Sequence, residues 1–370
     1  MTEHEKAVFE SFYLYNIDGI GSRTLEKLVN GAANVHTVFE MSDQELEKKI
    51  GTTKGKILRA ALQENTEKKM LAKYEKMLEK GITFCSKFDS DYPEKLRTIP
   101  DPPFGIYYKG RLPTPYKKQV AIVGARLCSE YGRYVTRLYS RALAESGAEI
   151  ISGMAAGIDA VGQKAALEAG GSSFAILGCG VDICYPQENR SLYQNLMEQG
   201  GVISEFSPGT KPISSYFPMR NRIISGLSDC VLIMEARQKS GTLITADMAL
   251  EQGRELFCLP GRVTDQLSHG CNRLISEGAG ILIQPDILIE NLGLGLNSTQ
   301  YLHDGEKKNS REQLILQILE AQTMTLQELY DRVKEEVEGT ISLSELMTIV
   351  AHMSVQKIIQ KSGLFLSKNS

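Results

Sequence analysis

The sequence predicts an α/β protein built around a doubly wound, mostly parallel sheet, with a helical domain before it and a winged helix after it. Seven short apolar runs carry this prediction: VAIVG (120–124), EIISG (149–153), SFAILG (173–178), GVISE (201–205), CVLIME (230–235), ELFCLP (255–260) and GILIQ (280–284). Continuous apolar runs rich in β-branched residues are typical of strands buried on both faces. Helical segments of roughly 10–15 residues separate them, which is the spacing of βαβ units. We therefore expect ligands at the carboxyl ends of these strands.

Composition excludes several classes of protein. The chain has 370 residues, of which 42% are hydrophobic and 24% charged, and its formal net charge is −3. These values exclude wholesale disorder and a general polyanion-coating protein. No apolar run approaches the roughly 18 residues of a membrane helix, and MTEHEKAVFE lacks a signal-peptide pattern, so we expect no membrane insertion. The seven cysteines are scattered without a CxxC pair, which predicts a reducing cytoplasmic location without disulfides or zinc.

Two different segments precede the predicted sheet. Residues 1–80 have apolar residues at helical spacing and predict a small helical domain. Within it, IDGIGSRTLEKLV (17–29) is either a helix-hairpin-helix, whose turn amides hold a phosphate in DNA-binding copies, or a tight turn in a domain like the sterile alpha motif. Residues 81–118 are crowded with proline and aromatic residues, so we expect an extended connector with short strands at 83–85 and 105–108.

A linker and a second small domain follow the predicted sheet. Residues 293–310 are polar and contain glycine, as linkers do, and 311–370 show three helical stripes and two short β-like runs, the layout of a winged helix. The third helix, at about 342–353, has no Lys or Arg and carries Glu345. A helix that reads duplex DNA needs cations near phosphates. We therefore predict a protein-contact or regulatory module here, not a duplex reader.

Small residues follow four of the predicted strands, each at the start of a predicted helix. They are Gly124, Ala125 and Arg126 after the first strand; Ser152, Gly153, Gly157 and Asp159 after the second; Gly178 and Gly180 after the third; and Ser240, Gly241 and Thr242 after the fifth. Glycine backbone at a helix start exposes N–H groups to anions, and an arginine adds a fork for phosphate. The pattern predicts one phosphate-lined crevice; the alternative is that the glycines serve only tight packing.

The most basic segment runs from Lys211 to Arg222. Lysine and arginine can hold phosphates there, an aromatic ring at Tyr216 or Phe217 can stack on a base, and Asn221 can read a base edge or brace a loop. The predicted DNA contacts are Lys211, Phe217, Arg220, Asn221 and Arg222. The structural alternative is that Arg220 and Arg222 open a helix and pair with Glu205 or Asp229.

No catalytic signature stands out in the sequence. The patterns GxxxxGK[ST], HExxH and GxSxG are absent. Gly178 and Gly180 fit the first two positions of GxGxxG, but Ile183 occupies the third. His269 is expected to be a loop or packing residue, and Cys179 a buried small hydrophobe. We therefore expect no catalytic residues, no metal and no cofactor.

Seven sequence blocks, in order, resemble the bacterial DNA-processing protein A family (DprA, also called Smf). They are VAIVGAR, SGMAAGID, LGCGVDICYPQEN, SEFSPGTKP, FPMRNRIISGLS, VLIMEARQKSGTLITADMALEQGRELFCLPG and HGCNRLISEGA. The resemblance covers essentially all of 119–292, and the flanking domains fit the longer members. It implies an extended Rossmann-like domain that binds single-stranded DNA, forms a homodimer and loads the RecA recombinase in natural transformation. It further implies a single-strand-binding protein as a partner and no established catalytic activity.

The resemblance also assigns roles to residues of this sequence. It makes Arg126 the phosphate-clamping arginine, Ser152, Gly153, Gly157 and Asp159 the second loop, Lys211 with Phe217–Arg222 the basic wall, and Ser240, Gly241 and Thr242 the helix-start amides. Two departures matter. Gln187 stands where some members have lysine after Tyr-Pro, so one phosphate contact is in doubt, and Thr242 stands where serine is more frequent.

A competing hypothesis comes from the lysine-decarboxylase-like phosphoribohydrolases, which the SGT helix start also resembles. Those enzymes use a PGGxGT loop and a catalytic glutamate on the next helix. Here the loop is KSGTLITA, without the double glycine, and Asp247 and Glu251 are the carboxylates on the predicted helix. A nucleotide-sensing domain is a third possibility. We predict a binder that prefers single strands, because the expected pocket is compact and has no long basic stripe.

Overall fold

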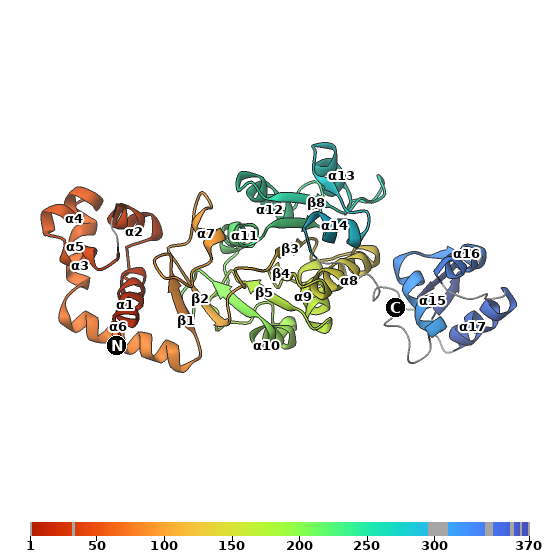
Figure 1. Ribbon diagram of the computed structural model, residues 1–370, viewed down its shortest axis with the longest axis horizontal. Helices are drawn as coiled ribbons and strands as arrows, with labels where there is room; N and C mark the ends of the chain where they lie inside the picture. Colours follow the sequence, from red (N-terminus) through yellow and green to blue (C-terminus); the bar gives the residue numbers. More distant parts are fainter. Residues whose placement is uncertain are drawn as a thin grey trace.

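The computed structural model describes residues 2–31, 34–294, 310–336, 343–355, 359–362 and 365–368. Figure 1 shows an elongated arrangement, with the first helices at one end, a large sheet in the middle and a small domain at the other end. Among the described residues, no helix is long and apolar enough to cross a membrane.

The helical domain at the N-terminus contains α1 (Glu3–Tyr15), α2 (Ser22–Val29), α3 (Thr37–Glu40), α4 (Asp43–Ile50), α5 (Thr52–Ala61) and α6 (Glu64–Glu79). Thr2 with Glu5, and Ser42 with Glu45, form capping boxes that fix the starts of α1 and α4. A turn through Gly19, at φ 83°, joins α1 to α2. A helical hairpin is therefore present at 17–29, and both hypotheses for its role remain predictions.

One nine-stranded sheet forms the centre of the molecule, in the order β1-β2-β6-β5-β4-β3-β7-β8-β9. Its strands are β1 (Thr83–Ser86), β2 (Gly105–Gly110), β3 (Gln119–Val123), β4 (Glu149–Ser152), β5 (Ser172–Ile176), β6 (Gly201–Ser204), β7 (Cys230–Ile233), β8 (Glu255–Cys258) and β9 (Gly280–Ile281). The strands from β3 to β9 pair in parallel. They coincide with the seven apolar runs, so the predicted doubly wound sheet is confirmed.

The proline-rich stretch 81–118 does more than connect two domains. Its strand β2 pairs antiparallel with β6, and β1 pairs antiparallel with β2. A single turn of helix, α7 (Glu94–Arg97), lies between them. The stretch therefore extends the sheet at one edge, where a strand that is antiparallel and partly exposed tolerates flanking prolines.

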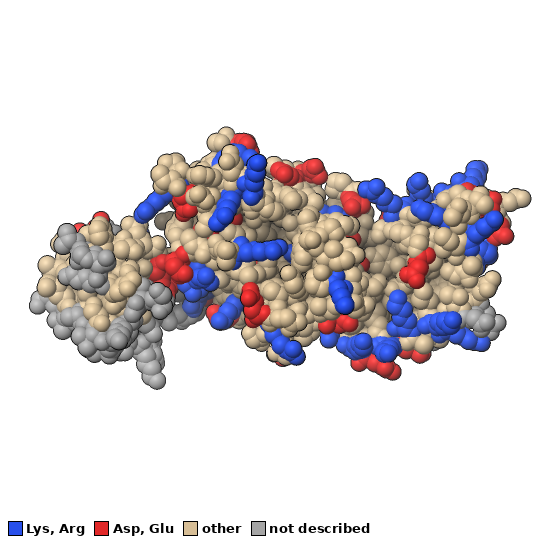
Figure 2. Space-filling view, turned by 180° about the vertical axis from the view of Figure 1, so that it is seen from behind, with Lys and Arg blue, Asp and Glu red and all other residues tan. Residues whose placement is uncertain are grey.

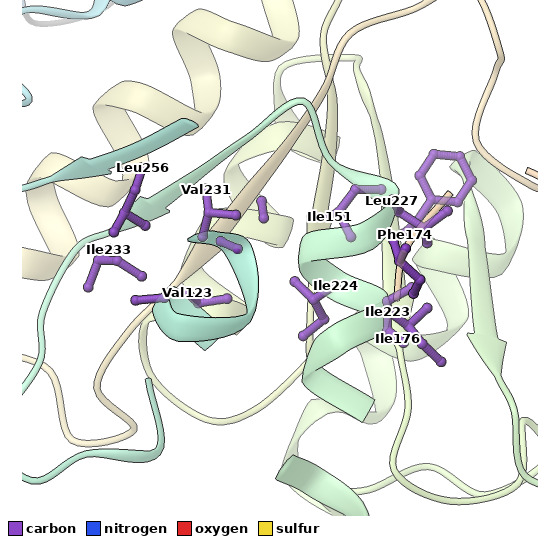
Figure 3. Packing of buried hydrophobic residues seen from close by; sticks show 14 of the residues in the cluster. Val123, Ile151, Phe174, Ile176, Ile223, Ile224, Leu227, Val231, Ile233 and Leu256 are labelled. Carbon is purple, nitrogen blue, oxygen red and sulfur yellow. The ribbon is translucent and has the colours of Figure 1, made fainter. Parts of the chain in front are cut away.

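Helices cover both faces of the parallel strands. α8 (Glu130–Glu145), α9 (Ile158–Glu168), α10 (Arg190–Gln199) and α14 (Pro285–Asn291) pack on one face, while α11 (Tyr216–Leu227), α12 (Gly241–Glu251) and α13 (His269–Ser276) pack on the other. Alternate residues of β3 point to opposite faces, so Ile122 meets the first group and Val123 the second. Figure 3 shows Ile223, Ile224 and Leu227 of α11 lying against the sheet.

The strand order reverses between β3 and β7. From β3 the chain winds through β4, β5 and β6 in one direction, and α11 then carries it back to β7 on the other side of β3. In doubly wound sheets this switch point leaves a crevice at the carboxyl ends of the two central strands. The loops that follow β3 and β7 are therefore where a ligand is expected.

The C-terminal domain has the elements expected of the predicted winged helix. It contains α15 (Ser310–Ala321), α16 (Leu326–Glu336) and α17 (Leu343–Val355), and a small antiparallel sheet in the order β10-β12-β11 made by Met324–Thr325, Phe365–Lys368 and Ile359–Ser362. Its buried residues form a core of their own. α15 lies against α8, where Arg137 and Glu320 approach to 3.2 Å.

Candidate nucleic-acid interface

Four loops meet at the carboxyl edge of the central sheet. They follow β5, β4, β3 and β7, which are neighbours in that order, and parallel strands present their carboxyl ends at the same edge. The four groups of small residues singled out in the sequence therefore lie together, as expected. The start of α11, which carries Phe217, packs against the loop after β5.

An exposed arginine and an aromatic ring form the centre of this edge. The guanidinium carbon of Arg126 lies 5.8 Å from the centroid of the Phe217 ring, a cation–π arrangement. The ring packs against Gly178, where an added Cβ would come within 2.9 Å of the Phe217 Cδ1 atom. Tyr185 lies beside the same ring, with centroids 5.5 Å apart. A phosphate near Arg126 and a base near Phe217 or Tyr185 would both find chemical partners here.

The two aromatic residues at the start of α11 have different surroundings. Tyr216 stacks on Phe206, with ring centroids 4.1 Å apart, whereas Phe217 faces Arg126 and Tyr185. Lys211, in the loop before α11, is exposed, and Asn221 is half-buried and accepts a hydrogen bond from Arg220 Nε at 3.2 Å. Of the predicted DNA contacts in this segment, Lys211 is exposed and Phe217 is half-buried, whereas Arg220 is buried.

Arg220 lies beneath this edge rather than on its surface. It is 5% exposed, and its Nη1 atom donates to Gly153 O at 2.9 Å and to Ile176 O. Burial lowers the pKa of Arg220 to about 10, so it remains charged at neutral pH. Burial also raises the pKa of Asp159, which Arg220 partly offsets, and Asp159 accepts from Gly153 N at 3.1 Å. Arg220 thus ties the loop after β4 to β5 and places a positive charge under the crevice.

Arg222 has carboxylate and carbonyl partners within the protein. Its Nη1 and Nη2 atoms donate to the two oxygens of Glu205 at 2.8 and 2.7 Å, and its Nε donates to Asp101 O at 3.0 Å. Burial alone would lower its pKa, but Glu205 raises it. Of the two alternatives for Arg222, the structure shows the pairing with Glu205. Asp229 instead pairs with Lys95.

Most of the glycines at this edge are packed closely against other atoms. A Cβ at Gly157, whose φ is 79°, would come within 2.3 Å of the carbonyls of Ala125 and Arg126, and one at Gly124 within 2.7 Å of Ile158. A Cβ at Gly180 would come within 2.8 Å of Gly209 N. Ser152 is buried and donates its hydroxyl to Ile122 O at 2.6 Å. These residues hold the loops in place, as the packing alternative expects, and phosphate binding by their backbone N–H groups stays a prediction.

The start of α12 is the most open of the four loops. Gly241 is exposed, with no heavy atom within 4 Å of an added Cβ, and Ser240 caps the helix by accepting from Thr242 N at 3.2 Å. Arg237 and Lys239 are exposed in the same loop. Arg237, Lys239 and Tyr185 were not among the contacts predicted from the sequence. Their position after predicted strands was the one signal that could have indicated them.

Charge over the molecule is mixed. The face in Figure 2 carries lysine and arginine side chains interspersed with aspartate and glutamate, rather than a continuous basic stripe. Among the described residues, no group of three or more His, Cys, Asp or Glu side chains is arranged to hold a metal ion. A few well-placed cations beside aromatic rings are therefore what this edge offers to a ligand.

Comparisons with known proteins agree with this architecture. The family model of DNA recombination-mediator protein A matches residues 83–293, which includes β1 and β2. Protein Smf of Escherichia coli is 44% identical over 207 residues, and that of Synechocystis 43% over 219 residues; these matches cover 56% and 58% of this chain. Each match spans 55% of the relative's own length.

Two solved structures are similar to this one. DNA processing protein A (DprA) from Streptococcus pneumoniae matches with a TM-score of 0.69 and 31% identity, over 76% of this chain and 97% of that one. DNA processing protein A from Helicobacter pylori, studied for its single-stranded DNA binding mode, matches with a TM-score of 0.52 and 30% identity, over 57% and 95% of the two chains.

Proposed function

The chain belongs to the DNA recombination-mediator protein A family, and on this premise we propose that it binds single-stranded DNA at the carboxyl edge of its sheet and loads the RecA recombinase onto that DNA. The pairing of Arg126 with Phe217 is the observation that carries the binding step. The guanidinium would hold a phosphate, while Phe217 and Tyr185 would stack on bases, which single strands expose and duplexes do not. Lys211 and the open start of α12 would extend this contact.

The geometry supports single strands over duplex DNA. Arg220 is buried on backbone carbonyls and Arg222 is paired with Glu205, so these two cations are unavailable to a second strand of phosphates. Duplex binding without base contacts depends on many phosphate contacts at once. A compact edge with Arg126, Lys211 and aromatic rings suits a strand whose bases are free.

A phosphoribohydrolase activity finds little support. The enzyme hypothesis needs a carboxylate on the helix that Ser240 caps. Glu251 is the last residue of α12, so at about 1.5 Å of rise per residue it lies more than two turns from the helix start. Asp247 is exposed on the same helix. We therefore propose a binding protein and not an enzyme.

The partners implied by the resemblance are part of the proposal. The resemblance alone supports RecA and a single-strand-binding protein as two partners, a role in natural transformation, and a cytoplasmic location.

A homodimer has one physical observation in its favour. Ile281, Ile283 and Ile287, at and after the edge strand β9, are 47%, 70% and 44% exposed, and an apolar edge strand is a common place for two copies to pair.

Competition binding tests the proposal. A labelled single-stranded oligonucleotide is bound to the full chain, and unlabelled single strands or the matching duplex are then added at fixed moderate salt. We expect the single strand to compete at much lower concentration than the duplex. Equal competition by both would contradict the proposed specificity. An unlabelled nucleoside monophosphate, tested for base release in the same samples, checks the enzyme alternative.

A further inference from the structure

A buried glutamate fills the switch point between β3 and β7. Glu235 follows β7 and is 3% exposed. Its carboxylate accepts from the backbone N–H of Ser129, at 3.1 Å to Oε2, and from the Ser129 hydroxyl. Ser129 is the N-cap of α8, and its Oγ also accepts from Gly132 N at 3.0 Å. Because an ionised carboxylate only accepts, the hydroxyl donates to Glu235 and receives from the helix.

The space around this carboxylate is shaped to hold it. A Cβ at residue 132 would come within 2.3 Å of the Glu235 Cδ atom and within 2.5 and 2.6 Å of its oxygens. Gly132 therefore leaves room that a larger residue would remove. Burial raises the pKa of Glu235, and hydrogen bonds from Ser129 partly offset this effect.

Glu235 lies beside a helix start that binds phosphate in many doubly wound folds. In those folds the first helix after the first parallel strand points its free N–H groups at a nucleotide phosphate beside the switch point. Here that helix is α8. Its first-turn Gly132 N donates to the Ser129 hydroxyl, and the N–H of Ser129, the N-cap, donates to the protein's own carboxylate. Gly132 N is therefore not free to bind an external phosphate at this helix start.

The same carboxylate holds one end of the loop that carries Arg126. The loop leaves β3 after Val123, whose carbonyl accepts from Met234 N at 3.0 Å. Its middle is held where Ala125 O accepts from Ile158 N at 3.2 Å, and its far end is Ser129. Arg126 is exposed between these anchors.

We propose that Glu235 is an internal anion that occupies the phosphate position of this fold and thereby positions the Arg126 loop for DNA. Its role in binding rests on the proposed function, because it acts only through Arg126. External phosphates are excluded from the helix start and are directed to the exposed guanidinium. Glu235 is a positioning residue and does not contact DNA.

Four single variants of the full chain and one double variant test this proposal; the single variants are Glu235→Ala, Glu235→Gln, Gly132→Ala and Arg126→Ala. We expect Glu235→Ala to weaken single-strand binding about tenfold, the scale of one charge-assisted contact. Its salt slope should fall by about 0.7, like that of Arg126→Ala, since one phosphate contact is lost. The double variant Arg126→Ala/Glu235→Ala should show no further loss. Gly132→Ala should reproduce the defect by displacing the carboxylate. Glu235→Gln keeps the shape and one acceptor but loses the charge, so its affinity should lie between those of Glu235→Ala and the wild type.

A second measurement does not involve DNA. Removal of the carboxylate in Glu235→Ala leaves an anion position free, so millimolar inorganic phosphate should raise its melting temperature more than that of the wild type at matched ionic strength. Phosphate should also restore part of the DNA affinity that the Glu235→Ala variant has lost. Equal phosphate effects on the melting of both proteins would overturn the internal-anion role. Wild-type affinity in both Glu235→Ala and Gly132→Ala, or additive losses in the double variant, would overturn the positioning role. If the wild type fails to bind single strands, the proposed function fails, and the melting measurement still decides the internal-anion role.

Discussion

The guanidinium of Arg126 lies over the ring of Phe217, with its carbon atom 5.8 Å from the ring centroid. The two residues are far apart in the chain, because Arg126 follows β3 and Phe217 lies in α11, which leads to β7 on the other side of β3. The loop after β3 supplies the charge, and the start of α11 supplies the ring. This places a phosphate partner and a base partner side by side at one edge of the sheet.

Replacing Phe217 by leucine should weaken single-strand binding about tenfold without changing the salt dependence. Stacking of a base on an aromatic ring contributes about 1–3 kcal/mol, and the change removes no charge. Phe217→Tyr keeps a ring and should bind nearly as the wild type does. Fluorescence anisotropy over a salt series measures both quantities. A reduced salt slope in Phe217→Leu would mean that the ring acts by holding Arg126 rather than by stacking.

Removing Glu205 should cost stability because it leaves a buried cation without its main partner. The side chains of Arg222 and Glu205 are 12% and 8% exposed and form two short hydrogen bonds. We expect Glu205→Ala to lower the free energy of unfolding by about 3 kcal/mol, as for other broken buried pairs. Glu168→Ala is the matched control, since Glu168 pairs with Lys164 on the surface and should matter by less than about 1 kcal/mol. Urea denaturation compares them, and equal losses would contradict the structural role of Arg222.

The raised pKa of Glu235 predicts a pH dependence of stability. Burial lifts its pKa above the reference value of 4.5, so the folded state binds this proton more tightly than the unfolded state does. Stability contributed by this group therefore falls as the pH rises from about 4.5 through the folded-state pKa. Glu235→Gln lacks this titration, so its melting temperature should rise relative to that of the wild type as the pH increases from 5 to 7. Melting temperatures that stay parallel over this range would show that the pKa of Glu235 is not raised.

The winged helix should be dispensable for single-strand binding. Its core is separate from that of the sheet, and it lies against α8 rather than across the Arg126 loop. A chain ending at Leu294 is the appropriate truncation, because Leu292 and Leu294 pack in the core beside α8 and α14. We expect this chain to stay folded and to bind single strands within a few-fold of the full chain. A tenfold loss would assign the winged helix a part in binding, and a shift of duplex DNA by the isolated domain would make it a duplex reader.

The sequence predicted the parallel sheet well because each strand carries its own local signal. Continuous apolar runs such as 230–235 are typical of strands buried on both faces, and parallel strands bring their ends to one edge. Strands β1 and β2 were predicted as short strands, but the pairing of β2 with β6 is non-local and has no signature in a proline-rich stretch. The sequence therefore showed a connector where the structure extends the sheet.

The sequence predicted which residues lie near the candidate site, but not which way their side chains point. Arg126, Arg220 and Arg222 look equivalent in a sequence, yet one is exposed, one lies on carbonyls and one is paired with a carboxylate. These differences depend on which neighbours the helix α11 meets across the sheet. Glu235 gave no signal either, since a single glutamate after a strand is ordinary until Gly132 is seen to face it.

The salt dependence of single-strand binding by Arg126→Ala tests the central claim most directly. Lys117→Ala is the matched control, because Lys117 is also exposed but precedes β3 at the opposite edge of the sheet. Binding of one oligonucleotide is measured for both variants and the wild type over a series of salt concentrations. The account predicts weaker binding by Arg126→Ala and a slope lower by about 0.7, with Lys117→Ala unchanged. An Arg126→Ala protein with wild-type affinity and slope would contradict the proposed DNA site at this edge.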